Sequence, residues 1–380
     1  MTSAPCIESA DFTRLQITAV LLVSVFGSVG AVVGPQLYGA LAHDHRITLV
    51  QLGQAATLEL VAKGLTVGVA GAWLKPDRLK AIALITTLSL AVAYWITSWI
   101  SGEPILLMAT FAGICEGLNL WILIGFLART PVPARMSGLF IGLNGAVAFA
   151  LASLYSYYVI PVRGATGGFS ILALTGLVLL PSVIFLPGRY GALAGRSLGT
   201  KLPDIRGITA LAAVFVYAAG ITSLWAYIDP VGRRSGLDAH SIGVAISASI
   251  ATHSGGGWIS FLFARWINPI AAISIAAGVN VLILILLWVG VPAIGFAALA
   301  SVFGFLWAFA VTFHIPLTLV ADRSGRATML IGSAQQFGSG AGPAIAALFV
   351  SAAGASGALG ASAMLFSLGG ILALIIGMTT

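Results

Sequence analysis

The chain has 380 residues, of which 59% are hydrophobic and 8% are charged. Soluble domains carry about 25% charged residues, so this composition excludes an ordinary soluble fold and is typical of an integral membrane protein. Its apolar runs are continuous and longer than a tilted strand needs, which excludes an outer-membrane barrel. The formal net charge of +7 is better explained by membrane topology than by nucleic-acid binding.

Twelve apolar segments follow one another along the chain. The first six cover residues 15–40, 49–74, 81–100, 104–128, 136–160 and 166–187. After a polar stretch, six more cover residues 208–228, 240–264, 269–290, 292–320, 327–352 and 357–378. Each is long enough to cross the hydrocarbon core as a helix. We therefore predict an all-α integral membrane protein with twelve transmembrane helices, built as an N-terminal six-helix bundle (1–187), a central cytoplasmic loop (188–207) and a C-terminal six-helix bundle (208–380).

The basic residues are distributed unevenly between alternate breaks. With the N-terminus inside, thirteen Lys and Arg residues fall on the cytoplasmic side. The opposite side then holds four, namely Arg46, Arg163, Arg233 and Arg234. Lys and Arg concentrate in cytoplasmic loops. The sequence thus predicts an inner (plasma) membrane protein with both termini in the cytoplasm.

A weak internal repeat supports the division into halves. ARMSGLFIGLNG (134–145) follows the fourth span, and GRATMLIGSAQQ (325–336) follows the tenth. In each, an Arg is followed four residues later by Leu and nine residues later by an amide side chain. Arg135 and Arg326 are 191 residues apart, about half the chain. Such internal symmetry is typical of transporter folds.

These features resemble the major facilitator superfamily over essentially the whole chain. GAWLKPDRLK (71–80) keeps Gly71 and Lys80 of the family's signature between spans two and three, with Asp77 at a shifted position. ADRSGR (321–326), after span ten, preserves more of that signature, and GSGAGP (338–343) places a Gly-Pro step in span eleven. The resemblance implies alternating access and a central cavity lined by spans one, four, seven and ten. It does not assign a subfamily.

Three charged residues lie inside predicted spans. Glu59 is about 15 Å from the outer end of span two, and Glu116 is about 18 Å from the outer end of span four, at 1.5 Å per residue. Lys63 is one turn from Glu59 on the same helix face. Intramembrane ionisable groups are expensive and mark ion or substrate pathways. We predict that Glu59, Glu116 and Lys63 form a proton-coupling site.

The roles within this group are open at the level of sequence. Glu59 and Lys63 are spaced to form a self-neutralising i,i+4 pair with a purely structural role. Glu116 has no cation within a helical turn, so it must reach another helix or be protonated. We favour Glu116 as the proton carrier. A three-charge site, with Lys63 near both carboxylates, is the third interpretation.

Uncharged polar and aromatic residues within the predicted spans indicate, less strongly than the charged residues, where a substrate would bind. The predicted substrate-binding residues are Gln36, Lys63, Asn119, Trp225, Trp307, His314, Gln335 and Gln336. Trp225, near the outer end of span seven, is better explained as an interfacial aromatic residue, and His314 is equally well explained as a hydrogen-bonded packing residue. Gln335 and Gln336 are adjacent in the chain and point about 100° apart on a helix, so at most one faces the cavity.

Charged turns after spans two and ten predict a gate. The candidate gating residues, which could form salt bridges between the halves, are Asp77, Arg78, Lys80, Asp322, Arg323 and Arg326. The positive-inside bias explains the basic residues but not the interleaved aspartates. We therefore favour a gating role for Asp322 and Arg326 over one for the 71–80 turn.

The sequence as a whole predicts a secondary active transporter that moves a small organic solute by proton symport. Lys63 and His314 suit an organic anion, such as an aromatic or amphipathic carboxylate. The alternatives are proton-coupled efflux of an apolar or cationic compound and a non-transporting sensor on the same fold. We expect no enzyme activity, no cofactor, no metal and no disulfide between Cys6 and Cys115. We expect a monomer whose partners are the substrate, protons and the lipid bilayer.

Overall fold

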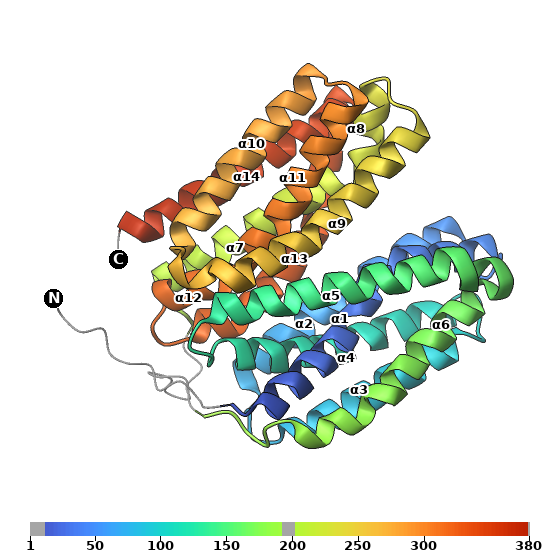
Figure 1. Ribbon diagram of the computed structural model, residues 1–380, viewed down its shortest axis with the longest axis vertical. Helices are drawn as coiled ribbons and strands as arrows, with labels where there is room; N and C mark the ends of the chain where they lie inside the picture. The colour runs from blue at the N-terminus through green and yellow to red at the C-terminus, as the bar shows by residue number, and fades with distance from the viewer. Residues whose placement is uncertain (1–11, 192–201, 379–380) are drawn as a thin grey trace. The chain divides into compact units, whose positions relative to one another are not determined.

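The computed structural model describes residues 12–191 and 202–378, in which every regular element is helical (Figure 1). In the first half the helices are α1 (Arg14–His43), α2 (Leu49–Trp73), α3 (Leu79–Thr97), α4 (Pro104–Leu127), α5 (Pro133–Leu154) and α6 (Ile160–Leu179). In the second half they are α7 (Ile205–Trp225), α8 (Ile228–Arg234), α9 (Ala239–Phe263), α10 (Pro269–Val289), α11 (Ala293–Thr312), α12 (His314–Ala321), α13 (Arg326–Ala353) and α14 (Ala355–Met378). Cys6 and residues 192–201 of the predicted central loop lie outside the described residues.

Side-chain caps fix where several of these helices begin. Thr13 and Thr48 each accept a hydrogen bond from the backbone N–H three residues later. The side chains of Gln16 and Gln51 accept one from the cap backbone in return, which completes a capping box. Three helices of the second half begin at a capping side chain: Asp204 for α7, Asp238 for α9 and Asn268 for α10. The caps satisfy N–H groups that a helix otherwise leaves free.

Helix length and hydropathy agree with the predicted spans. Within the described residues, nine segments are long and apolar enough to cross a membrane, and one of them, Pro133–Phe185, runs through both the fifth and the sixth predicted spans. Helices α9 and α13 complete the twelve; they are 25 and 28 residues long but are richer in Ser, Gly, His and Gln. The prediction of an all-α, twelve-span membrane protein is confirmed.

Three local features depart from the predicted pattern of plain spans. The short helix α8 follows α7, and the tenth span breaks at Phe313 into α11 and α12. A π-helical turn, Tyr155–Val159, joins α5 to α6 without a loop. The break expected between these spans is instead a kink at Gly164, whose φ is 55°. The adjacent N–H of Ala165 donates a hydrogen bond to the Asp44 carboxylate at 2.8 Å.

Backbone contacts divide the chain into two compact units. Unit 1 comprises Met1–Pro133, Val147–Leu202 and Arg323–Ser333, and unit 2 comprises Ala134–Ala146, Pro203–Asp322 and Ala334–Thr380. In unit 1, α4 packs against α1, α2 and α3. In unit 2, α9 packs along α11, and α14 packs against α7 and α10. The predicted bundles 1–187 and 208–380 stay a prediction.

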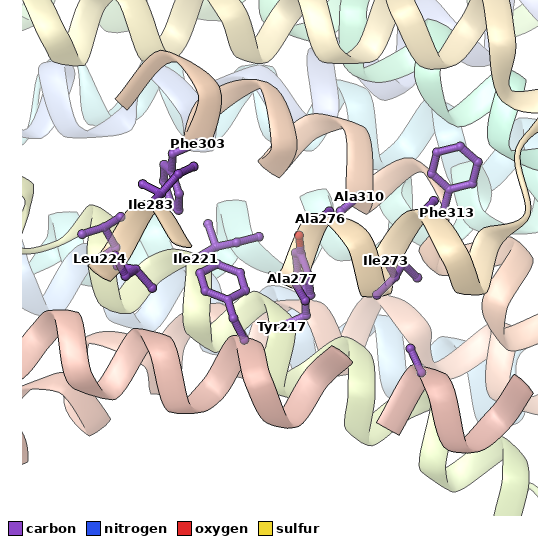
Figure 2. Packing of buried hydrophobic residues seen from close by; sticks show 14 of the residues in the cluster. Tyr217, Ile221, Leu224, Ile273, Ala276, Ala277, Ile283, Phe303, Ala310 and Phe313 are labelled. Atoms are coloured by element: carbon purple, nitrogen blue, oxygen red, sulfur yellow. The ribbon is translucent and has the colours of Figure 1, made fainter. Parts of the chain in front are cut away.

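Aromatic and small side chains together fill the core of unit 2 (Figure 2). Tyr217, Phe303 and Phe313 are fully buried there, and Ala276 and Ala277 of α10 belong to the same cluster. In lipid, small residues let helices approach closely. The alternation of rings and small residues therefore produces a packed core although the helices are apolar all round.

Candidate functional site

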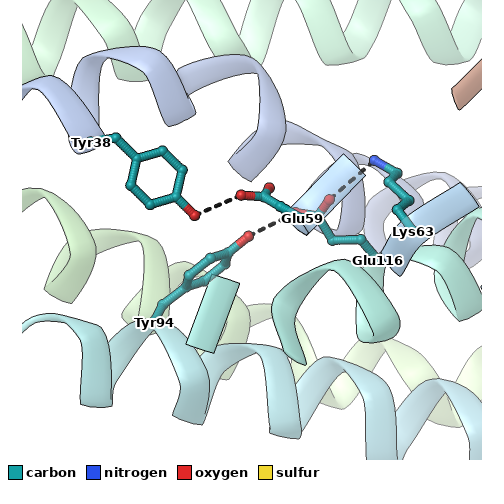
Figure 3. A network of polar contacts seen from close by, with 5 residues as sticks. All are labelled: Tyr38, Glu59, Lys63, Tyr94 and Glu116. Atoms are coloured by element: carbon teal, nitrogen blue, oxygen red, sulfur yellow. Dashed lines mark hydrogen bonds and ion pairs between the residues drawn. The ribbon is translucent and has the colours of Figure 1, made fainter. Parts of the chain in front are cut away.

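Five polar side chains from four helices meet inside unit 1 (Figure 3). Tyr38 comes from α1, Glu59 and Lys63 come from α2, Tyr94 comes from α3 and Glu116 comes from α4. None of the five is more than 6% exposed. Because buried ionisable groups are costly unless they are paired and hydrogen-bonded, the partners of each charge decide what this network can do.

Each carboxyl group of the network has a different set of partners. Lys63 Nζ lies 3.1 Å from Glu116 Oε2, and the Tyr94 hydroxyl donates a hydrogen bond to Glu116 Oε1 at 2.9 Å. The Tyr38 hydroxyl donates to Glu59 Oε2 at 2.6 Å. Figure 3 shows the two carboxyl groups next to each other, with both phenols on one side of them and the Lys63 ammonium on the other side, next to Glu116. Glu116 thus has a charged and a neutral partner, whereas Glu59 is held by a phenol.

Two glycines of α4 bring this helix against α2 at the network. Gly113 and Gly117 are one turn apart and flank Glu116 in the sequence. A Cβ atom at Gly113 would collide with the backbone oxygen of Glu59, and one at Gly117 would lie 2.8 Å from the backbone oxygen of Lys63. Such close backbone approach requires a residue without a side chain. The Gly-x-x-x-Gly segment therefore sets the distance between the two charged helices.

The structure brings together all three predicted proton-coupling residues, Glu59, Lys63 and Glu116. Among the described residues, the ion pair of Lys63 is formed with Glu116 and not within α2. Two members of the network are absent from the predicted site, Tyr38 and Tyr94. A phenol within a strongly apolar span is the sequence signal that could have found Tyr94, since a buried Tyr hydroxyl needs a partner.

Two predicted substrate-binding residues of the first half make other contacts. Gln36 Nε2 donates a hydrogen bond to the carbonyl of Ala152 in α5 at 3.2 Å. Asn119 lies one turn after Glu116 in α4, and its Oδ1 accepts a hydrogen bond from the Thr86 hydroxyl of α3 at 2.7 Å. Asn119 is 1% exposed. A substrate role for these two residues stays a prediction.

Trp225 and Trp307, the predicted aromatic residues of the second half, lie together in unit 2. Their ring centroids are 5.7 Å apart, with the rings close to perpendicular. The imidazole of His253 on α9 also contacts Trp307, with ring centroids 5.0 Å apart. All three rings are partly exposed. His253 was not among the predicted site residues, although its place in the middle of an apolar span is a signal of the same kind as Glu59.

His314 and Gln335, predicted for the same site, contact each other. Gln335 Nε2 lies 3.0 Å from His314 Nδ1. His314 is 1% exposed and packs edge-on against Tyr217, with ring centroids 5.5 Å apart. Gln336 is partly exposed on α13. These contacts give His314 a packing role, while its role in substrate binding stays a prediction.

The predicted gating residues lie in the two charged turns. Asp77, Arg78 and Lys80 are exposed, and Lys80 Nζ donates a hydrogen bond to the carbonyl of Ile184 at 2.7 Å. Asp322 is buried at the end of α12. Arg323 is exposed, and Arg326 begins α13. Gating by these residues stays a prediction. In residues 12–191 and 202–378, no group of three His, Cys, Asp or Glu side chains could hold a metal ion.

Comparisons with known proteins give structural matches only. No protein-family model matches the sequence, and no curated protein matches it. The major facilitator superfamily transporter FucP in its outward conformation superposes with a TM-score of 0.75 at 15% identity, covering 95% of this chain and 97% of that one. The human organic anion transporter MFSD10 (TETRAN) gives a TM-score of 0.73 at 16% identity, covering 95% and 99%. A variant of the E. coli fucose:proton symporter FucP gives 0.72 at 14% identity, covering 96% and 99%.

These matches extend over nearly the whole of each chain, and the topology that they share is the one expected from the sequence. At 14–16% identity they establish the fold and leave the substrate open. The chain has the fold of the major facilitator superfamily transporters, with no subfamily assigned.

Proposed function

We propose that this protein is a secondary active transporter that moves a small organic solute by alternating access, with proton symport through the network of Tyr38, Glu59, Lys63, Tyr94 and Glu116. The observation that carries the proposal is the presence of two buried carboxyl groups and one buried ammonium at one place. Two buried carboxylates and one ammonium would leave one uncompensated negative charge, and protonation of one carboxyl group removes it.

The contacts favour Glu59 as the group that takes up and releases the proton. Lys63 and Tyr94 stabilise an ionised Glu116, so this pair is neutral overall. Among the residues that the structure describes, the uncharged Tyr38 hydroxyl is the one hydrogen-bond donor to the Glu59 carboxyl group. The site is therefore balanced when Glu59 is protonated and carries a net negative charge when Glu59 is ionised. Sequence alone favours Glu116 as the carrier, and the proposal assigns that role to Glu59.

The proposal assigns Lys63 to the proton-coupling site rather than to the substrate-binding site. The predicted organic-anion substrate depended on Lys63 as its partner, and the ammonium of Lys63 already faces Glu116 at 3.1 Å. An anion would have to displace this carboxylate. One protein of the same fold is a fucose:proton symporter, so proton symport of an uncharged solute is known chemistry for this architecture. We further propose an inner-membrane location with cytoplasmic termini, which the distribution of basic residues supports.

The test is uptake into proteoliposomes under an imposed pH gradient. The compounds are labelled fucose, benzoate, benzamide and benzylammonium, which cover a sugar and the three charge states of one aromatic ring. We expect an inward proton gradient to drive accumulation of at least one compound. Glu59→Gln should abolish this accumulation and retain exchange of the compound across the membrane, because glutamine mimics a permanently protonated carboxyl group.

Glu103→Gln is the matched control, because Glu103 is exposed and precedes the same helix, α4, that carries Glu116. This variant should behave as the wild type. If a compound is transported at the same rate with and without the pH gradient, proton coupling is contradicted. Export driven by the gradient would support the efflux alternative, and no flux of any compound would support a sensor.

A further inference from the structure

The helix pair α9 and α11 of unit 2 repeats the close packing of α2 and α4 in unit 1. A Cβ atom at Gly113 of α4 would collide with the backbone oxygen of Glu59 in α2. A Cβ atom at Gly304 of α11 would collide in the same way with the backbone oxygen of Ser249 in α9. Gly113 and Gly304 are 191 residues apart, the offset of the internal repeat. Glu59 and Ser249 are 190 residues apart, so the two contacts align α4 with α11 at an offset of 191 and α2 with α9 at an offset of 190.

This alignment identifies what unit 2 has at the position of the ion pair. Four residues after Glu59 comes Lys63, and four residues after Ser249 comes His253. Three residues after Gly113 comes Glu116, and three residues after Gly304 comes Trp307. The correspondence also holds in space. Lys63 Nζ lies 3.1 Å from Glu116 Oε2, and the ring centroids of His253 and Trp307 are 5.0 Å apart. A neutral ring pair replaces the ion pair.

The ring pair continues into a larger surface, which we call the ring cluster: His253, Trp307 and Trp225. The ring centroids of Trp225 and Trp307 are 5.7 Å apart, and all three side chains are partly exposed. The His253 imidazole packs nearly perpendicular to the Trp307 ring, with ring centroids 5.0 Å apart. Its Nδ1 is enclosed and has no hydrogen-bond partner among the described residues.

Neither α9 nor α11 contains an Asp, Glu, Lys or Arg residue. The charged residues of unit 2 occur at helix ends, in α8 or in turns: Arg135, Asp204, Arg206, Asp229, Arg233, Arg234, Asp238, Arg265 and Asp322. Along α9, Asp238 and Arg265 are about 22 and 18 Å from His253 at 1.5 Å per residue. Asp229, the acidic residue nearest Trp225 in sequence, is already paired with Arg233.

The charge of a ligand on the ring cluster follows from this distribution. A charged ligand would lose its hydration with no opposite charge on α9 or α11 to compensate, and the attraction of a cation to a ring face is smaller than that loss. An uncharged ring loses little hydration and gains perpendicular or offset ring contacts.

We propose that the ring cluster binds an uncharged aromatic or heteroaromatic solute through ring contacts with Trp225, Trp307 and His253. This inference rests on the proposed transport function and names its substrate class. The two units then have different roles: unit 1 binds and releases the proton, and unit 2 binds the neutral solute.

The test is equilibrium binding of benzamide, benzoate and benzylammonium to the purified full-length protein. These probes share one ring and differ in charge, and benzamide alone is neutral. We expect benzamide to bind at least tenfold more tightly than the two ions. His253→Ala and Trp307→Ala should each weaken benzamide binding at least tenfold. Trp307→Phe, which keeps a ring, should retain most of the affinity and guard against a loss caused by misfolding.

Trp288→Ala is the matched control, because Trp288 is 48% exposed at the end of α10 and lies outside the ring cluster. It should bind benzamide like the wild type. The proposal is overturned if an ion binds as tightly as benzamide, if none of the three probes binds, or if His253→Ala and Trp307→Ala leave binding unchanged. Glu59→Gln should keep benzamide binding, so failure of the ring cluster and failure of proton coupling are separate outcomes.

Discussion

Lys63 forms its ion pair with Glu116 on the neighbouring helix α4, at 3.1 Å, although Glu59 lies one turn away on its own helix. Removing one partner of a buried ion pair leaves an uncompensated charge, at a cost of about 3–5 kcal/mol. We therefore expect Lys63→Met to lower the free energy of unfolding by about this amount. Denaturant unfolding of the purified protein measures it.

A pair of double variants distinguishes the two possible partners of Lys63. Adding Glu116→Gln to Lys63→Met removes the charge left behind, so most of the lost stability should return. Adding Glu59→Gln should restore less of the free energy of unfolding, because Glu59 is not the ion-pair partner of Lys63. If the second double variant were the more stable one, the i,i+4 pair suggested by the sequence would be the real interaction.

The two phenols of unit 1 provide a second prediction about the network. The Tyr94 hydroxyl donates to Glu116 at 2.9 Å, and hydrogen bonds to charged groups contribute about 1.5–3 kcal/mol. Tyr94→Phe should lower the free energy of unfolding by that amount. Tyr155→Phe is the matched control, because the Tyr155 hydroxyl is equally buried and has no partner in the described part of the chain. Equal losses in the two variants would show that the phenol of Tyr94 contributes by packing alone.

Composition, charge distribution and helix depth were sufficient to predict the twelve spans and the common depth of Glu59 and Glu116. The partner of Lys63 could not be predicted in this way, because spacing along one helix favours Glu59. The approach of α4 is a tertiary feature that Gly113 and Gly117 permit. Among 46 glycines in the chain, those two carry no local mark that distinguishes them.

The missed members of both sites have the same explanation. Tyr94 lies in α3 and contacts Glu116 of α4, and His253 lies in α9 and contacts Trp307 of α11. Which way such a helix is rotated depends on packing against its neighbours rather than on its own hydrophobic pattern, since it is apolar on all faces. Trp225 and Trp307 could be predicted because the family resemblance assigns their spans to the cavity.

The close contact of Gly113 leads to a third prediction. Gly113→Ala inserts a methyl group against the backbone of Glu59, and overpacking of this kind costs about 1–3 kcal/mol. Gly39→Ala in α1 is the matched control, because a Cβ atom there has no neighbour within 4 Å. Alanine is the better helix former by about 1 kcal/mol, so Gly39→Ala should be neutral or stabilising. Thermal unfolding of both variants tests this, and a neutral Gly113→Ala would mean that α2 and α4 are further apart.

Arg46, in the turn between α1 and α2, leads to the last prediction. Its guanidinium donates hydrogen bonds to the carbonyls of Ser98 and Ile100, both at 3.0 Å, just beyond the end of α3. Burial lowers the pKa of Arg46, and the Asp44 carboxylate opposes this effect. The residue is therefore a partly buried cation at a helix C-terminus, where carbonyl groups have no partners within the helix.

Replacing Arg46 should consequently loosen the corner between α1, α2 and the end of α3. We expect Arg46→Ala to lower the free energy of unfolding by about 1.5–3 kcal/mol, because charge-assisted hydrogen bonds are lost. Arg46→Lys should recover only part of this, since an ammonium cannot reproduce the planar fork of a guanidinium. Arg233→Ala is the control: its pair with Asp229 is exposed, and such pairs contribute little. Faster amide hydrogen exchange at the end of α3 in Arg46→Ala, but not in Arg233→Ala, would locate the effect. Equal stability of the two variants would contradict it.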